Sequence, residues 1–420
     1  MKKKICISGL GYIGLPTAAM FATHGHEIVG VDVNQKVVSA LNQGKITIEE
    51  PYLDIMVQAA VTSGNLKAKT EPEEADVFII AVPTPINENK TADMSYVISA
   101  TKSIVPYLKE GNIIILESTS PPGTVENIMI PILEESGLEI GEELLVAHSP
   151  ERVLPGKILM ELVENNRIIG GVNKKSCNAV KELYETFVRG EIFLTNPTTA
   201  EMTKLMENTF RDVNIGLANE LAKICESMNI NAWEVIELSN KHPRVNIHQP
   251  GPGVGGHCLA VDPWFIVEKS PELSKIINLS RKTNDSMPMH VLNRIEEILP
   301  NEKETKKITI LGITYKPNID DMRESPILEL IELLEKDSKY EINVVDPYVM
   351  SHKYIEKNIF KAVENSDILV LGVNHEDFKT LDFKRISSLM NKKEVLDTRN
   401  FWDEETIEEA GLNYNLLGRK

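Results

Sequence analysis

The sequence predicts an α/β protein with two doubly wound domains, joined by a central helical region that contains one long helix. Three observations support this fold class. Short apolar runs alternate with amphipathic helical stretches up to about residue 197, and the same alternation returns after residue 300. Such alternation is typical of βαβ units around a parallel sheet. Between the two series, residues 198–228 have a helical pattern without proline and with a single glycine.

The chain length supports the same division. At about 150 residues per domain, 420 residues predict two or three domains. We place the expected boundaries at 1–197, 198–300 and 301–420. The charged stretch Asn301–Lys307 is the expected linker before the last domain.

The strands of the first domain are expected where short runs of β-branched and aliphatic residues end at glycine, proline or polar residues. These runs are Lys4–Ser8, Glu27–Val31, Val77–Val82, Ile113–Glu117, Leu144–Ala147, Arg167–Gly170 and Glu191–Leu194. The stretches between them include three expected amphipathic helices, Pro16–His24, Gln35–Asn42 and Met94–Leu108.

The central region is predicted to be helical apart from one interruption. Its long helix is expected over Thr198–Met228, and a segment rich in glycine and proline, His248–His257, divides the rest of the region. Further apolar runs predict the strands of the last domain. These are Ile308–Leu311, Ile342–Val345, Ile368–Leu371 and Val395–Asp397.

The charge balance excludes two classes of partner. The chain has 45 lysine and arginine residues against 62 aspartate and glutamate residues, which gives a net charge of −17. Binding along nucleic acid or on an anionic membrane needs a basic surface, so we expect neither partner. A local basic pocket for a small anion is compatible with an acidic exterior.

The N-terminus has a basic head and an apolar run, as secretory signal peptides do. Three glycines and Pro16 break this run, and a buried strand followed by a glycine turn explains those residues. The four cysteines are widely spaced and include no C-x-x-C pair, which is typical of a reducing compartment. We therefore expect a cytoplasmic protein.

The first expected strand is followed by Gly9-Leu-Gly11-Tyr-Ile-Gly14, the glycine spacing of a Rossmann dinucleotide-binding turn. The first glycine permits a tight turn, the second lets the backbone approach a pyrophosphate, and the third allows close packing of helix and strand. Asp32 ends the second expected strand, where a carboxylate binds both ribose hydroxyls and repels a ribose phosphate. The sequence therefore predicts Rossmann-like domains and NAD, rather than NADP, as the cofactor.

Two threonines follow later strands, at the edge where ligands bind in such sheets. Thr84 follows the strand at Val77, and Thr119 follows the strand at Ile113. Each is expected either to contact the cofactor or to cap a strand end with its hydroxyl.

A glycine-rich segment precedes Cys258. Gly253, Gly255 and Gly256 let the backbone fold closely around a ligand, and a cysteine in such a loop is accessible. A thiol with a reference pKa of about 8.5 needs a nearby cation to be ionised at neutral pH. The remaining cysteines lie in strand or helix patterns and are expected to be core residues: Cys6, Cys177 and Cys225.

Other polar residues are candidates for anion binding or acid–base chemistry. Offsets of four and three place Lys204, Asn208 and Arg211 on one face of the long helix, either as part of a site or as solvated surface. Glu151 and Arg152 follow an expected strand and are suited to be a base and an anion clamp. No histidine, cysteine or carboxylate cluster has metal-ligand spacing, so we expect no metal, and the pair His24 and His26 is expected at the surface.

Taken together, these motifs resemble the UDP-glucose/GDP-mannose dehydrogenase family over essentially the whole chain. The matching segments are Gly9-x-Gly11-Tyr-Ile-Gly14, Ser149-Pro-Glu151-Arg152, Lys204-x-x-x-Asn208, Gly255-Gly256-x-Cys258, and Lys316 with Asp320-Asp321-x-Arg323-Glu-Ser-Pro326. Within the family, residues 242–265 are similar to the branch that oxidises UDP-N-acetyl-D-mannosamine. Ala260 and Val261 stand where the glucose-type pattern has proline and lysine, which argues against glucose as the sugar and puts in doubt any cofactor contact made from that lysine. UDP-N-acetylglucosamine or its galacto isomer is the alternative substrate.

The resemblance implies a four-electron oxidation of a primary alcohol on the sugar to a carboxylate, with two NAD per sugar, for polysaccharide biosynthesis. The Cys258 thiolate adds to the intermediate aldehyde, and the thiohemiacetal is oxidised to a thioester that water hydrolyses. Lys204 and Asn208 are implied to stabilise the oxyanion, with proton transfer from the alcohol as the other role for Lys204. Asp262 would orient water or handle a proton, and hydrolysis would use Thr119 and Glu151, the better base.

The resemblance also carries over binding residues by matching position. The implied NAD contacts are Gly9, Gly11, Tyr12, Ile13, Gly14, Asp32, Thr84, Thr119 and Arg323. The implied contacts to the UDP-amino-sugar are Arg152, Val153, Lys204, Asn208, Arg211, His242, Arg244, Gly253 and Lys316. The central helix is implied to form a homodimer or a higher homo-oligomer, in which Arg244 acts across the interface.

Two other functions fit parts of the sequence. A two-electron NAD enzyme of the β-hydroxyacid type needs no cysteine and forms one NADH per substrate. The second alternative is a non-catalytic module that senses NAD, but it assigns no function to the Cys258 loop.

Overall fold

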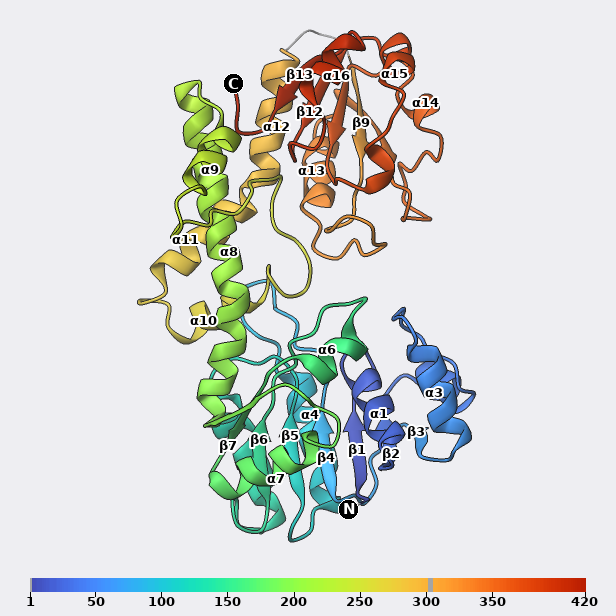
Figure 1. Ribbon diagram of the computed structural model, residues 1–420, viewed down its shortest axis with the longest axis vertical. Coiled ribbons are helices and arrows are strands. Elements are labelled where there is room, and N and C mark those ends of the chain that lie inside the picture. Colours follow the sequence, from blue (N-terminus) through green and yellow to red (C-terminus); the bar gives the residue numbers. More distant parts are fainter. Residues whose placement is uncertain (1, 301–304) are drawn as a thin grey trace. The chain divides into compact units, whose positions relative to one another are not determined.

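The computed structural model describes residues 2–300 and 305–420, which form two compact units (Figure 1). The first unit comprises Met1–Glu207 and Trp264–Pro271, and the second comprises Asn208–Pro263 and Glu272–Lys420. Residues 301–304 of the expected charged linker lie outside the described residues. In the described parts of the chain, no helix is both long enough and apolar enough to span a membrane.

The first unit is built on an eight-stranded sheet with the order β3-β2-β1-β4-β5-β6-β7-β8. The strands are β1 (Lys4–Ser8), β2 (Glu27–Val31), β3 (Leu66–Lys69), β4 (Val77–Ile80), β5 (Ile113–Leu116), β6 (Leu145–His148), β7 (Arg167–Gly171) and β8 (Ile192–Thr195). The central strands are buried along their length because helices cover both faces of the sheet.

Each face of this sheet has its own buried cluster. One cluster joins the sheet to α1 (Gly14–Thr23), α2 (Gln35–Asn42), α3 (Leu53–Thr62), α6 (Ile158–Glu164) and α7 (Lys174–Tyr184). The other joins it to α4 (Ser95–Ile104), a π-helical turn at Val125–Met129 and α5 (Ile130–Leu133), with 3₁₀ turns at Val105–Tyr107 and Glu134–Ser136. This two-faced arrangement is the doubly wound fold that the sequence predicts.

The pairing of β6 with β7 departs from the expected all-parallel sheet. β7 runs antiparallel to β6, with Ala147 opposite Gly171 and His148 opposite Gly170. The connection between them carries only the short helix α6, which packs against α1, so the chain does not cross back to the start of the sheet. As a result β7 begins at the edge where β1–β6 end, as does β8, which is parallel to β7, and Arg167 lies at that edge.

The second unit contains a five-stranded parallel sheet with the order β10-β9-β11-β12-β13. Its strands are β9 (Lys306–Leu311), β10 (Tyr340–Val345), β11 (Ile368–Leu371), β12 (Glu394–Asp397) and β13 (Asn413–Leu416). Its helices include α9 (Ala232–Ser239), α11 (Lys275–Asp285), α12 (Met287–Ile298), α13 (Pro326–Glu335), α14 (Ile359–Ala362), α15 (Phe383–Leu389) and α16 (Glu404–Glu409), with a 3₁₀ turn at Glu376–Phe378. Two buried clusters again cover the two faces of the sheet.

Two helices contribute residues to both units. α8 (Pro197–Met228) is the long helix expected from the sequence, and its residues up to Glu207 belong to the first unit. α10 (Asp262–Lys269) begins in the second unit, and its residues from Trp264 belong to the first.

The strands β3 and β13 were not predicted. Both lie at an edge of their sheet, so part of each strand faces solvent and neither has a continuous apolar run. The pair His24 and His26 was predicted at the surface, which is wrong for His26. Its ring is buried and meets the Phe21 ring edge-on at 5.6 Å.

The end of β12 provides a stability test. The fully buried carboxylate of Asp397 accepts hydrogen bonds from the backbone N–H groups of Arg399 (2.8 Å) and Phe401 (2.7 Å) and from the Tyr414 hydroxyl (3.0 Å). Asp397→Ala leaves these donors unsatisfied, so we expect the free energy of unfolding to fall by about 2–4 kcal/mol in urea titrations. The exposed Glu405→Ala is the matched control, expected within about 0.5 kcal/mol of the parent chain. Equal stability of the two variants would contradict the assignment.

Candidate functional site

The turn between β1 and α1 has the backbone geometry that a dinucleotide needs. Gly9 has φ +94°, and a Cβ there would lie 2.4 Å from the carbonyl oxygen of Ala81. A Cβ on Gly14 would lie 1.8 Å from the carbonyl oxygen of Gly9, so both positions require glycine. Gly11, in contrast, is exposed and has open space around its Cβ position, which leaves room for a ligand to approach the backbone. These residues fit a pyrophosphate at the N-terminus of α1.

Asp32 lies at the end of β2 beside this turn. Its Oδ2 accepts the backbone N–H of Leu10 at 3.1 Å, and its Oδ1 accepts the backbone N–H of Asn34 at 2.8 Å. The side chain is half-buried, so the carboxylate is held in place while part of it still faces solvent. This is the arrangement expected of a carboxylate that binds ribose hydroxyls.

The loops after β4 and β5 are joined by a hydrogen bond. The Thr84 hydroxyl donates to the carbonyl oxygen of Thr119 at 2.6 Å, and the Ser118 hydroxyl donates to the carbonyl oxygen of Val82 at 2.8 Å. Of the two roles expected for Thr84, the structure thus contains the strand-end hydrogen bond. Thr119 itself is half-buried at the same edge of the sheet.

Glu151 is nearly buried and tightly held. Its Oε2 forms an ion pair with Nη2 of Arg167 at 2.6 Å, and its Oε1 accepts the backbone N–H of Arg152 at 2.8 Å. The Arg152 guanidinium, expected to clamp an anion, pairs here with the Glu207 carboxylate at 2.7 Å and donates to the carbonyl oxygen of Asn166. An anion that binds Arg152 must therefore compete with Glu207.

Arg167 and Glu117 were seen in the sequence only as strand ends. Both are buried, and Nη1 of Arg167 lies 3.7 Å from Oε1 of Glu117. Glu117 also accepts hydrogen bonds from the hydroxyls of Tyr184 and Thr17. Burial raises the pKa of Glu117 to about 7, since the Arg167 cation opposes that shift only in part and the Glu151 charge adds to it. The signal in the sequence that could have indicated both residues was a charged residue at the end of an apolar strand.

The Cys258 loop packs onto the start of the last domain within the second unit. The backbone N–H of Gly256 donates to the carbonyl oxygen of Arg323 at 3.2 Å. A Cβ on Gly255 would lie 2.3 Å from the carbonyl oxygen of Glu324, so this close approach needs glycine. Cys258 is exposed, whereas the other three cysteines are buried, as predicted.

Cys258 lies one turn before α10, and Asp262 begins that helix. The backbone N–H of Asp262 donates to the carbonyl oxygen of Cys258 at 2.9 Å. The buried Asp262 carboxylate accepts a hydrogen bond from Nδ2 of Asn208 on α8 at 2.5 Å. Arg211, one turn further along α8, donates to the amide oxygen of the same asparagine. The structure thus joins Asn208, Arg211 and Asp262, three of the residues predicted for the site.

A second buried network stabilises the segment that leads to Cys258. Arg281 on α11 pairs with Asp212 on α8, and both side chains are almost completely buried. Asn284 donates to Asp212 at 2.8 Å and accepts from Asn219, whose amide oxygen in turn receives the backbone N–H of Gly251 at 2.9 Å. These residues were not predicted, because polar positions in amphipathic helices look like solvated surface.

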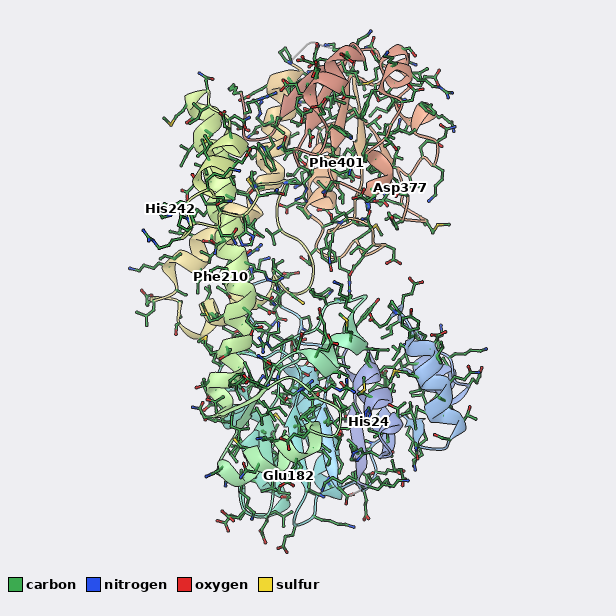
Figure 2. The ribbon with its side chains drawn as sticks, viewed as in Figure 1. His24, Glu182, Phe210, His242, Asp377 and Phe401 are labelled. Carbon is green, nitrogen blue, oxygen red and sulfur yellow. The ribbon has the colours of Figure 1, made fainter. Side chains whose placement is uncertain are left out.

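Of the remaining predicted binding residues, Lys204 on α8 is buried, whereas four others are exposed. His242 and Arg244 are exposed on the segment after α9, where Figure 2 labels His242, and Lys316 is exposed on the segment after β9. Arg323 is exposed and forms a two-pronged ion pair with Asp321. Gly253 has φ +134°, and a Cβ there would lie 2.6 Å from the Pro326 ring.

The first turn of the second sheet repeats that of the first sheet with one change. Gly312 donates its N–H to Val345, as Gly9 does to Val31, and Asp346 accepts the N–H of Ile313 at 2.8 Å. Unlike Asp32, Asp346 is completely buried, and it also contacts the ring of His375 at 3.2 Å. This aspartate is therefore not available to a ribose.

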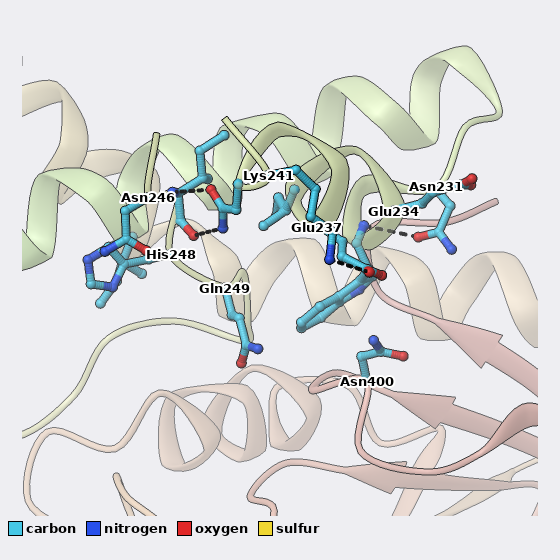
Figure 3. Close-up of a pocket in the computed structure, with 13 residues that line it drawn as sticks. Asn231, Glu234, Glu237, Lys241, Asn246, His248, Gln249 and Asn400 are labelled. Atoms are coloured by element: carbon cyan, nitrogen blue, oxygen red, sulfur yellow. Dashed lines mark hydrogen bonds and ion pairs between the residues drawn. The ribbon is translucent and has the colours of Figure 1, made fainter. Parts of the chain in front are cut away.

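A cavity of about 840 Å³ lies within the second unit, between α9, the segment 246–249 and Asn400 (Figure 3). Its walls are mostly polar, with an ion pair of Glu237 and Lys241 at 3.2 Å and hydrogen bonds between Asn240 and Ile247. None of the residues predicted for catalysis lines it.

Comparison with known proteins identifies the three parts of the chain. Residues 3–188 match the NAD binding domain of the UDP-glucose/GDP-mannose dehydrogenase family, residues 198–286 its central domain, and residues 309–404 its UDP binding domain. The chain belongs to this family. It is therefore an NAD-dependent dehydrogenase of nucleotide sugars, as the motifs predict.

Individual relatives are similar over almost their full length. A UDP-N-acetyl-D-mannosamine dehydrogenase of Methanocaldococcus jannaschii is 50% identical over 99% of this chain and 96% of that protein. An NDP-N-acetyl-D-galactosaminuronic acid dehydrogenase of Ralstonia nicotianae is 47% identical over 96% of this chain and 97% of that protein. Among solved structures, the UDP-N-acetyl-mannosamine dehydrogenase Cap5O from Staphylococcus aureus has a TM-score of 0.90 and 48% identity, covering 99% of both chains. The fold class and the family are thus confirmed, while the roles of single site residues stay predictions.

The glycine turn of this dehydrogenase supplies a matched test. Gly11→Ala meets no protein atom within 4 Å, so we expect an unchanged melting temperature but a weakening of NAD binding by at least about tenfold, because the methyl group blocks approach to the backbone. Gly9→Ala collides with the Ala81 carbonyl and is expected to lower the melting temperature itself. Calorimetric titration and thermal unfolding measure the two effects. Unimpaired NAD binding by a folded Gly11→Ala variant would contradict this cofactor site.

Proposed function

We propose that this dehydrogenase oxidises UDP-N-acetyl-D-mannosamine to UDP-N-acetyl-D-mannosaminuronate, using two NAD per sugar. The observation that carries the proposal is the exposed Cys258, set in a glycine loop whose backbone packs onto the 315–326 segment of the UDP binding domain. The high identity to relatives named for this sugar supports the choice of substrate.

The cysteine explains how one site performs two oxidations. When bound, NAD accepts a hydride in each of them. The aldehyde formed first has no alcohol hydrogen left to give, so the Cys258 thiolate adds to it and forms a thiohemiacetal. Oxidation of that adduct gives a thioester, and hydrolysis releases the acid and the free thiol.

Several residues are assigned to the two oxidations. Asn208 donates a hydrogen bond to the oxyanion, and Asp262, which Asn208 contacts in the structure, orients water or transfers a proton. Lys204 has two alternative assignments, as a second oxyanion donor or as the acceptor of the alcohol proton. Glu151 is the base for thioester hydrolysis, with Thr119 assisting.

The binding residues are assigned as the sequence predicts. For NAD they are Gly9, Gly11, Tyr12, Ile13, Gly14, Asp32, Thr84, Thr119 and Arg323. For the UDP-amino-sugar they are Arg152, Val153, Lys204, Asn208, Arg211, His242, Arg244, Gly253 and Lys316. Within this proposal the chain divides at residues 197 and 300 into the NAD-binding, central and UDP-sugar-binding parts, and the protein acts in the cytoplasm.

The proposal includes a homodimer or a higher homo-oligomer through α8, with Arg244 acting across the interface. Five exposed apolar side chains support it. Their spacing of four, seven, seven and four residues places them on one stripe of the helix, and they are Met206, Phe210, Leu217, Ile224 and Met228. Solvent-exposed apolar stripes of this length are typical of helices that pack against a second copy.

A panel of UDP-sugars tests the substrate and the stoichiometry together. We expect UDP-N-acetyl-D-mannosamine to give the highest kcat/KM and two NADH per sugar consumed, measured by absorbance and by mass analysis of the product. A strong preference for UDP-N-acetylglucosamine or the galacto isomer would replace the proposed sugar, and the Ralstonia relative makes the galacto isomer the second candidate. One NADH per sugar would contradict the four-electron reaction.

Removal of the thiol tests the covalent route. We expect Cys258→Ala to lose formation of the acid by at least about 1,000-fold, because the aldehyde then has no nucleophile to join. Cys225→Ala, which removes a buried thiol from α8, is the control and is expected to keep activity within about threefold. Full acid formation by a folded Cys258→Ala variant would overturn the assignment.

A further inference from the structure

Arg167 occupies an unusual position at the carboxyl edge of the first sheet. Only about 5% of its surface is exposed, and its guanidinium faces two buried carboxylates. Nη2 lies 2.6 Å from Oε2 of Glu151, and Nη1 lies 3.7 Å from Oε1 of Glu117. The same Nη1 donates to the Ser149 hydroxyl at 3.1 Å. One cation is thus shared between two acids.

The antiparallel direction of β7 creates this arrangement. In a strand parallel to β6, the first residue would lie at the opposite edge of the sheet, far from the segment that comes after β6. Because β7 starts where β6 ends, Arg167 meets Glu151 directly. Tyr184 on α7 then fixes the cation from one side, since its ring centroid lies 4.1 Å from the guanidinium carbon.

Both oxygens of Glu151 are oriented by this environment. One accepts the guanidinium of Arg167, and the other accepts the backbone N–H of Arg152 at 2.8 Å. A buried carboxylate without a paired cation is costly in a medium of low dielectric constant. Arg167 therefore supplies both a paired charge for Glu151 and a fixed direction for its lone pairs.

Glu117 is the second carboxylate that lies beside the Arg167 cation. The groups that face its carboxylate are Arg167 from β7, Glu151 from the segment after β6, Tyr184 from α7 and the Thr17 hydroxyl from α1. With both acids ionised, the cluster of two carboxylates and one guanidinium carries a charge of −1, so the two acids repel each other. Burial and this repulsion raise the pKa of Glu117 to about 7, in spite of the Arg167 cation.

We propose that Arg167 is a positioning residue that holds the Glu151 carboxylate aligned for thioester hydrolysis, and that Glu117 adjusts the basicity of Glu151 by competing for the same guanidinium. The inference rests on the proposed function, in which Glu151 is the base. In the step concerned, the oxygen of water bonds to the thioester carbon while its proton passes to Glu151. The C–S bond then breaks, and its electron pair leaves on the Cys258 sulfur.

The ionisation of Glu117 sets the pH dependence of hydrolysis. Below pH 7, a protonated Glu117 leaves Arg167 entirely to Glu151, which makes Glu151 a weaker base. Above pH 7, an ionised Glu117 draws on Arg167 and repels Glu151, which makes Glu151 a stronger base. Hydrolysis should therefore accelerate as pH rises through about 7.

Rapid-mixing experiments on the full-length enzyme separate oxidation from hydrolysis. Saturating NAD and the best sugar of the panel are mixed with enzyme while NADH absorbance and the intact mass of the protein are followed. For Arg167→Gln we expect a burst of two NADH per active site, an accumulating thioester on Cys258, and hydrolysis slowed by about 100-fold. Arg167→Lys keeps the charge and is expected to recover at least about tenfold of that loss. The exposed Arg189→Gln is the control, expected to behave as the parent enzyme.

Glu117→Gln tests the second half of the proposal and keeps the shape of the buried side chain. The parent enzyme should show hydrolysis that rises by several-fold between pH 6 and 8, and this variant should lose that rise and stay near the parent's rate at low pH. The inference would be overturned if folded Arg167→Gln showed no burst, if lysine failed to rescue it, or if Glu117→Gln kept the pH dependence. A parent enzyme that forms one NADH per sugar, or no adduct at all, would instead refute the four-electron function itself.

Discussion

Arg167 and Arg281 are both almost completely removed from water, and each guanidinium lies against at least one carboxylate that is buried with it. A buried ion pair contributes little net stability, yet loss of one partner leaves an uncompensated charge in a medium of low dielectric constant. Each pair therefore fixes the relative positions of the elements that carry its members. In the first unit the pair connects β7 to the segment after β6. In the second unit it connects α8 to α11, and through Asn284 and Asn219 to the loop that leads to Cys258.

In the turn after β1 and in the loop before Cys258, glycines are needed where other atoms lie too close for a Cβ. Gly9 and Gly14 are required because their neighbours leave no space for a Cβ, whereas Gly11 is surrounded by space that a ligand can enter. Gly255 resembles the first kind, since the carbonyl oxygen of Glu324 lies against it. The glycine motif at the N-terminus therefore combines structural glycines with one that is available to the cofactor, and the glycines before Cys258 hold the loop against the UDP binding domain.

The acidic net charge of −17 is reconciled with a diphosphate substrate by how the cations are paired. Arg152 is paired with Glu207, and Arg323 with Asp321, at partly exposed positions. Such exposed ion pairs contribute only about 0–1 kcal/mol, so a phosphate or a ribose can exchange for the carboxylate at small cost. The deeply buried Arg167, in contrast, cannot leave its partners, which suits it to hold a base rather than a ligand.

Local sequence patterns predicted much of this protein. Alternation of apolar and amphipathic stretches indicated both sheets, and the first glycine turn with Asp32 indicated NAD, because these features depend on neighbours close along the chain. The exposed Cys258 was predicted from its glycine-rich surroundings for the same reason. The edge strands β3 and β13 escaped prediction because their exposed faces remove the apolar signal.

Only the tertiary structure decided the partnership of residues distant in the sequence. Glu117, Glu151 and Arg167 meet because β7 runs antiparallel to β6, and strand direction has no signature in a run of apolar residues. Asp212 and Arg281, 69 positions apart, appear on amphipathic helices as ordinary surface charges until the helices pack. The sequence determined the fold class, the glycine turn after β1 and the exposed thiol of Cys258 through local chemistry. The pairing of buried charges was decided only by folding, because the energy of a charge depends on what surrounds it in space.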